Sequence, residues 1–217
     1  MYRTKIINFL IRKHNYKSYL EIGVNNPEDN YNLVECEKKE CVDPYTADSF
    51  SISNLPDLSN NNVASFLTYR MTSDEFFSKV NKKYDLIFID GLHTEEQSSR
   101  DLMNAMLHLN PGGKIVLHDS CPYHEEYQVE NGEEVGIGIP WLGQVWKTIY
   151  KLGLDENGFN YFTLNYEPGV TIVDYSEKIP NLNYKLDLEY ADAVSDEQIW
   201  SERLRLITGY DFIEIFL

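Results

Sequence analysis

Two aspartates and a histidine are the residues of this 217-residue sequence whose types and spacing point most directly to chemistry. Asp90 and Asp119 each follow a short apolar run, and His93 comes three residues after Asp90. Two carboxylates that lie close together repel each other unless they share a proton or a cation lies between them. An imidazole beside them can take up a proton near neutral pH. The trio therefore indicates a metal site with a base.

The unit that must position this trio runs from residue 84 to residue 122. Residues 86–89 and 115–117 are continuous apolar runs, typical of strands buried on both faces of a parallel sheet. Between them, a capping box at Thr94 and Gln97 and apolar residues at helical spacing predict a helix. Strands joined in this way usually lie side by side, about 5 Å apart, and bind ligands at their carboxyl edge. We expect the trio to meet there; the alternative is that its histidine and second acid only cap helices or face solvent.

A second set of residues suits a nucleoside. A strand at residues 19–24 contains Glu21 followed by Gly23, and a glycine at this point lets a ligand approach the backbone. Asp43 closes the next short strand, roughly 20 residues later, where an acid can hydrogen-bond both hydroxyls of a ribose. The alternatives are a glycine that merely ends a strand and an aspartate that opens a turn before Pro44. Their joint occurrence favours the nucleoside.

The remaining segments predict flanking elements. Residues 120–140 are too long for a plain connection and suggest a lid or substrate loop. Ser73 is expected to cap a helix that carries Asp74 in its first turn. The other expected elements are an amphipathic N-terminal helix, some helical character at 28–39, a third strand at 63–69, a helix opened by Trp141 and ending near 152, a hairpin at 160–164 and 170–175, and a helix from Ser195 to about 206. We therefore expect one α/β domain over residues 1–217, with its core at 18–175, an N-terminal helix at 1–17 and a C-terminal extension at 176–217.

Composition excludes several classes of partner. The net charge is −16, and the 19 Lys and Arg residues form no cluster, so nucleic acid and anionic membrane surfaces are not expected partners. An anionic ligand would need a local Arg or Lys to hold it against this field. The three cysteines form no C-x-x-C pair and suit a reduced, cytoplasmic setting. The N-terminus reads as no signal peptide, and no segment is long and apolar enough to span a membrane.

Taken together, these motifs resemble a known family. The segments YLEIGVNN, ECVDPY, MTSDEFF, YDLIFIDGLHTEEQSSRDL, LNPGGKIVLHDSCP and WLGQVWK, in that order, resemble class I S-adenosylmethionine-dependent methyltransferases over roughly residues 18–152. More narrowly, they look like the metal-dependent sugar O-methyltransferases of polysaccharide and macrolide pathways. The resemblance implies a Rossmann-like, doubly wound, mostly parallel seven-stranded sheet with an antiparallel closing hairpin.

The resemblance also implies roles for individual residues. It places Glu21 and Gly23 at the methionine end of the cofactor, Asp43 at the ribose, and Ser73 and Asp74 near the adenine. Two further residues complete the expected cofactor contacts: Asn25, which stands where the family has a second glycine, and Asp90. Asp90 and Asp119 would bind Mg²⁺ or Mn²⁺, and His93 would be the general base, with Asp90 beside it. His118 and Glu21 are candidates for a third metal ligand.

The sequence therefore predicts an S-adenosylmethionine-dependent O-methyltransferase that acts on a hydroxyl of a sugar, sugar nucleotide or glycan precursor, and it leaves a homo-oligomer open. One rival is an NAD-dependent oxidoreductase, which the missing G-x-G-x-x-G and Tyr-x-x-x-Lys elements oppose. The other is a catalytically inactive cofactor-binding or scaffold protein of a glycan-biosynthesis cluster. The altered glycine loop favours that reading, and the Asp90–His93–Asp119 trio opposes it.

Overall fold

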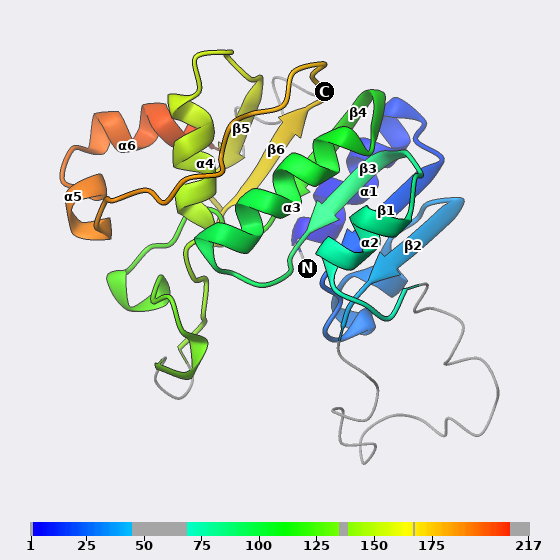
Figure 1. The fold of residues 1–217 in the computed structure, drawn as a ribbon, viewed down its shortest axis with the longest axis horizontal. Helices are drawn as coiled ribbons and strands as arrows, with labels where there is room; N and C mark the ends of the chain where they lie inside the picture. Colours follow the sequence, from blue (N-terminus) through cyan, green and yellow to red (C-terminus); the bar gives the residue numbers. More distant parts are fainter. Residues whose placement is uncertain (1, 45–68, 135–138, 167, 209–217) are drawn as a thin grey trace.

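The computed structural model describes residues 2–44, 69–134, 139–166 and 168–208 (Figure 1). Its centre is a seven-stranded sheet in the order β2-β1-β3-β4-β6-β5-β7. The strands are β1 (Ser18–Ile22), β2 (Lys38–Val42), β3 (Tyr84–Ile89), β4 (Leu109–Leu117), β5 (Tyr161–Leu164), β6 (Val170–Asp174) and β7 (Leu206–Ile207). Strand β6 is antiparallel to both neighbours, and the other pairings are parallel. The predicted fold class is confirmed, including its antiparallel hairpin.

Helices cover both faces of this sheet. The helices are α1 (Tyr2–His14), α2 (Ser73–Lys79), α3 (Glu95–Leu107), α4 (Val145–Leu154), α5 (Tyr190–Val194) and α6 (Glu197–Leu204). Helix α1 lies behind the sheet and α2, α3 and α4 lie in front of it in Figure 1. Alternate residues of the central strands accordingly enter two cores: Leu86 and Phe88 pack with the α1 side, whereas Ile87 and Ile89 pack with the α3 side.

Several predicted boundaries are wrong for local reasons. Thr72, not Ser73, is the N-cap of α2, because its hydroxyl accepts the Glu75 N–H and the Glu75 carboxylate returns to the Thr72 N–H. Asp196, not Ser195, caps α6 by accepting the Ile199 N–H. The segment that opens with Trp141 is a turn, and α4 begins only at Val145. Residues 28–39 contain 3₁₀ turns before β2.

The structure confirms the predicted cap of α3 and the predicted hairpin, and it changes or leaves untested two predicted strands. Thr94 does cap α3, since its hydroxyl accepts the Gln97 N–H. The expected third strand at 63–69 lies almost wholly outside the described residues, although Tyr69 forms a parallel bridge with Val42. The expected hairpin is confirmed as β5 and β6. Strand β4 begins six residues earlier than its predicted apolar run.

A buried ion pair fastens the C-terminal part of the chain to the front helices. Nζ of Lys151, in α4, lies 3.0 Å from Oε1 of Glu95 at the start of α3. The same ammonium donates to the carbonyl oxygens of Leu182 and Tyr184, at 2.9 and 3.0 Å. The Leu186 N–H donates to Glu95 at 2.7 Å. These contacts fix residues 182–186 across α3 and α4. They leave Oε2 of Glu95 buried without a hydrogen-bond partner among the described residues.

None of the helices in the described ranges combines the length and apolar character needed to cross a bilayer. Cys36 and Cys121 form no disulfide within the described residues.

Candidate active site

The sheet brings the two aspartates together at its carboxyl edge. Strands β3 and β4 pair in parallel with Ile89 opposite Leu117, and the His118 N–H donates to the Ile89 carbonyl oxygen at 3.1 Å. Asp90 and Asp119 therefore leave neighbouring strands at the same level. Potential ligand atoms of Asp90, His93 and Asp119 all lie within 4.8 Å of one another. The predicted meeting of these three side chains is what the structure shows.

The imidazole of His93 faces both carboxylates. Its Nε2 lies 3.3 Å from Oδ1 of Asp90 and 3.3 Å from Oδ2 of Asp119. Its Nδ1 lies 3.1 Å from the carbonyl oxygen of Trp141. A carbonyl oxygen can only accept, so Nδ1 carries a proton and Nε2 is the atom that exchanges a proton or binds a cation.

The turn at residues 141–144 holds His93 in this orientation. The Gln144 N–H donates to the His93 carbonyl oxygen at 2.7 Å. Gly143 has a φ of +57°, and a Cβ there would overlap the His93 carbonyl oxygen. Trp141 also donates its indole N–H to the Val129 carbonyl oxygen at 2.8 Å. The same turn thus contacts the His93 backbone, the His93 ring and the loop.

The carboxylates and imidazoles of the site shift one another's pKa values. Burial raises the pKa of Asp90, but the charge of His118, its contact with Asp90 and the hydrogen bond from His93 outweigh it and leave that pKa well below its ordinary value. Burial lowers the pKa of His93, but the hydrogen bond to Asp90 and the charge of Asp119 bring it above its ordinary value. The site therefore favours ionised carboxylates and attracts positive charge.

His118 is a functional candidate that the sequence marked only weakly. Its Nδ1 lies 2.9 Å from Oδ1 of Asp119 and 3.4 Å from Oδ1 of Asp90. Burial opposes protonation of His118, yet the charge of Asp90 and the contact with Asp119 raise its pKa to about 10. His118 contacts the Asp119 oxygen that His93 does not, so it can fix the orientation of that carboxylate.

The turn after β1 runs directly beside Asp90. Gly23 has a φ of +80°, and a Cβ there would overlap the Asp90 carbonyl oxygen, so only glycine fits. Asn25 follows with a φ of +47°, which asparagine tolerates better than most residues. The close approach of the two backbones fixes the position of this turn against the metal-binding candidates.

Asp43 holds the same turn from the next strand. Its Oδ2 accepts the Val24 N–H at 2.8 Å and the Asn25 N–H at 3.1 Å. These bonds keep the turn in place although the family's second glycine is absent. Asp43 thus stands at the end of β2, where the ribose was expected, and already contributes one oxygen to the loop.

Glu21 lies buried under α1. Its Oε2 accepts from the Tyr19 hydroxyl at 2.5 Å and from the Asn30 side-chain amide at 3.0 Å. Burial is the main cause that raises its pKa to about 8. Glu21 is outside the group that could hold a metal, as is the other third-ligand candidate, His118.

The expected adenine side is a polar cluster around Gln97. Its amide nitrogen donates to Ser73, Asp74 and Asp101, at 3.1, 3.4 and 3.0 Å. Asp101 is 1% exposed, and burial raises its pKa to about 6. Asp101 was not among the residues predicted from the sequence. The available signal was an acid at the helical spacing of Ser98, Leu102 and Ala105, which α3 buries.

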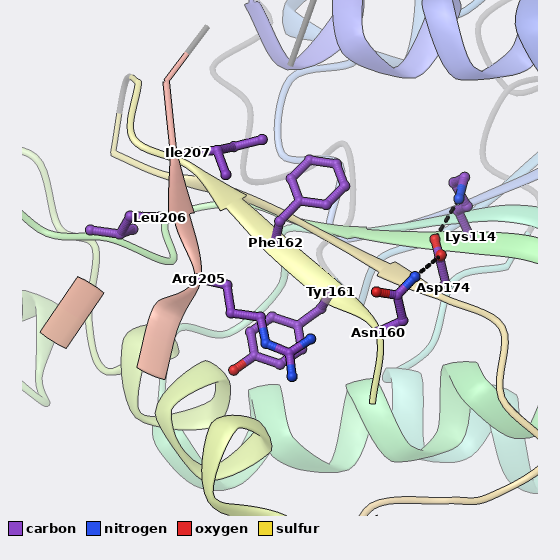
Figure 2. A pocket seen from close by; sticks show the side chains of 8 residues that line it. All are labelled: Lys114, Asn160, Tyr161, Phe162, Asp174, Arg205, Leu206 and Ile207. Carbon is purple, nitrogen blue, oxygen red and sulfur yellow. Dashed lines mark hydrogen bonds and ion pairs between the residues drawn. The ribbon is translucent and has the colours of Figure 1, made fainter. Parts of the chain in front are cut away.

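A separate hollow of about 540 Å³ lies along β5, β6 and β7 (Figure 2). In Figure 2, Lys114 and Asn160 both point to Asp174, whose carboxylate pairs with one and accepts from the other. Arg205 lies over the Tyr161 ring, 4.4 Å from its centroid. The single carboxylate that lines this hollow is already paired, and the hollow lies apart from Asp90, His93 and Asp119.

Comparisons with known proteins agree with the class of enzyme predicted from the sequence. Residues 20–120 match the family model described as a methyltransferase domain. No curated protein matches the sequence. Solved structures similar to the chain include cofactor-bound Rv0187 from MTB (14% identity, 82% of this chain and 81% of that chain, TM-score 0.55) and the SAH-bound methyltransferase PaMTH1 from Podospora anserina (15%, 81% and 78%, 0.52). An O-methyltransferase from Bacillus cereus in complex with SAH is similar as well (11%, 81% and 81%, 0.51). At these identities the structural likeness establishes the fold. The domain match covers residues 20–120, which contain the predicted site, and agrees with the predicted enzyme class.

Proposed function

We propose that this class I S-adenosylmethionine-dependent methyltransferase transfers its methyl group to a hydroxyl oxygen of a sugar, sugar nucleotide or glycan precursor. The observation that carries the proposal is the convergence of Asp90, His93 and Asp119, with ligand atoms within 4.8 Å of one another. A sulfonium methyl group is already activated, so the enzyme's task is to make a poor nucleophile reactive. Two acids and an oriented imidazole suit that task.

The donor set fits a hard divalent cation. Carboxylate oxygens are the ligands that Mg²⁺ and Mn²⁺ prefer, and no thiolate stands among the three candidates. Asp90 and Asp119 would hold the ion. When bound, it would supply positive charge that lowers the pKa of a nearby hydroxyl. The low pKa of Asp90 keeps that ligand ionised.

His93 would act as the general base. The acceptor oxygen attacks the methyl carbon, the O–CH₃ bond forms as the S–CH₃ bond breaks, and the hydroxyl proton passes to Nε2 of His93. Nδ1 keeps its proton and donates it in a hydrogen bond to the Trp141 carbonyl oxygen, and the two carboxylates stabilise the imidazolium that forms. S-adenosylhomocysteine leaves with its sulfur as an uncharged thioether.

The choice of acceptor is supported by two weaker arguments. The oxygen acceptor agrees with the similar Bacillus cereus structure, which is described as an O-methyltransferase. The sugar rests on the resemblance of roughly residues 18–152 to sugar methyltransferases. The substrate loop after Asp119 contacts the His93 turn through Tyr127, whose carbonyl oxygen accepts the Leu142 N–H at 2.8 Å. An acceptor held by this loop would therefore lie near His93.

Methyl transfer from radiolabelled S-adenosylmethionine to a panel of sugars and sugar nucleotides tests the proposal. We expect transfer to at least one acceptor, its loss with EDTA, and recovery with Mg²⁺ or Mn²⁺. Full rate in EDTA would contradict the metal, and transfer to amines alone would contradict the oxygen acceptor.

A catalytically inactive cofactor-binding protein is the second candidate, favoured by Asn25 in place of glycine. S-adenosylhomocysteine binding without transfer to any acceptor would support it. A small-molecule acceptor, a cytoplasmic location and a homo-oligomer stay predictions.

A further inference from the structure

The side chain of Arg3 brings a positive charge to an otherwise acidic edge. Arg3 lies in the first turn of α1, and its Nη1 is 3.4 Å from Nε2 of His118. Its Nε is buried and has no hydrogen-bond partner among the described residues. A buried N–H of a charged group is costly to leave unpaired, so the position suits a ligand that supplies an acceptor.

The position of Arg3 is fixed by its neighbour in the helix. The Thr4 hydroxyl donates to Oδ1 of Asn30 at 2.8 Å, and the Asn30 amide donates to Glu21 at 3.0 Å. This chain of bonds ties the first turn of α1 to β1. Arg3 is near enough to Glu21 for its charge to oppose the effect of burial on that carboxyl. Because burial raises the pKa of Glu21 to about 8, Glu21 is mostly protonated at neutral pH and leaves the charge of Arg3 available to a ligand.

The surrounding charges select the ligand. Asp90 and Asp119 would repel a simple anion, and the whole chain carries a net charge of −16. A group with both an ammonium and a carboxylate matches acids and arginine together. The start of the 13-residue helix α1 adds partial positive charge on the side of the carboxylate.

We propose that Arg3 binds the carboxylate of the methionyl part of S-adenosylmethionine. The assignment rests on the function proposed above, since it requires the cofactor to lie at this edge of the sheet. An anionic group of the acceptor has the same chemistry and is separated from the cofactor by the experiment.

Calorimetric titration of the full chain with two ligands tests the assignment. S-adenosylhomocysteine carries the amino-acid end, and 5′-methylthioadenosine lacks it. We expect Arg3→Met to weaken S-adenosylhomocysteine binding on the order of 10- to 100-fold, as for loss of a charged hydrogen bond, and to leave methylthioadenosine binding within about twofold. Arg3→Lys keeps the charge, so its affinity for S-adenosylhomocysteine should lie between those of the unaltered chain and Arg3→Met.

Arg12→Met is the matched control, because Arg12 lies on the same helix and pairs with exposed Glu35 at 3.0 Å. It should change neither affinity. Two results would overturn the assignment. If Arg3→Met and Arg3→Lys weaken the binding of both ligands equally, Arg3 has a structural role. If they weaken the binding of neither ligand, the partner of Arg3 is an anionic group of the acceptor or His118. If the unaltered chain binds neither ligand, the premise of a cofactor site fails and the assignment falls with it.

Discussion

Nδ1 of His93 lies 3.1 Å from the carbonyl oxygen of Trp141, and this single contact decides which ring nitrogen faces the two aspartates. The acceptor belongs to the backbone, so no side-chain replacement at Trp141 removes it directly. Orientation of His93 is therefore a property of the turn formed by residues 141–144.

His93→Gln should lower kcat by on the order of 100- to 10,000-fold, the usual contribution of a general base. Mn²⁺ affinity, measured by electron paramagnetic resonance, should stay within about threefold. His93 is close enough to the acids to be a metal ligand instead. In that case Mn²⁺ affinity would fall with activity, and the assignment as a base would be wrong.

Asp119→Asn should abolish metal-dependent transfer and weaken Mn²⁺ binding at least about tenfold, because the second carboxylate is lost. The variant keeps the backbone, since Asp119 has a φ of +55° that asparagine also adopts readily. Asp196→Asn, at the cap of α6, removes a remote carboxylate and should leave Mn²⁺ binding unchanged. Unaltered Mn²⁺ affinity in Asp119→Asn would contradict the metal site.

Gly143→Ala should lower kcat on the order of 100-fold, because its Cβ would displace the His93 backbone. The control is Gly158→Ala, which has a similar φ of +68° but open space around the added Cβ. Both variants should lose about 1–2 kcal/mol of stability from the left-handed backbone, measured by urea unfolding. Equal kcat in the two variants would show that the turn does not position His93.

Glu21→Gln should gain stability relative to the unaltered chain as pH rises from 5 to 8.5. The folded pKa of Glu21 is raised from 4.5 to about 8, so the folded state holds a proton that the unfolded state releases between these values. Stability from this group is present below pH 4.5 and is lost as pH rises through 8, by a few kcal/mol. Thermal unfolding of both proteins across this range measures it, and a difference independent of pH would be inconsistent with the raised pKa.

Much of the central unit was predictable from sequence. The apolar runs before Asp90 and Asp119 are long enough to define buried strands, and parallel strands must end at one edge. Ile89 pairs with Leu117, as expected of the last residues of two parallel strands that end at the same edge of the sheet. The hairpin of β5 and β6 was predictable because each strand is flanked by turn residues.

Features set by tertiary contacts were not predictable. Thr72 and Ser73 are both good caps, and only the backbone path decides between them. The residues at 141–144 have helical character, but contacts with His93 hold them in a turn. Arg3 lies 115 residues from His118 in sequence, so nothing local marks it as part of the site.

The buried pair of Lys151 and Glu95 also bears on when the site can form during protein synthesis. Lys151 needs the carbonyl oxygens of Leu182 and Tyr184, and Glu95, two residues beyond His93, needs the Leu186 N–H. Leu186 lies 91 residues beyond Glu95, so the ribosome adds these partners only after it has made Asp90, His93 and Asp119. Until then the start of α3 lacks its anchor, so a nascent or prematurely terminated chain would display the methyltransferase motifs without a settled catalytic edge.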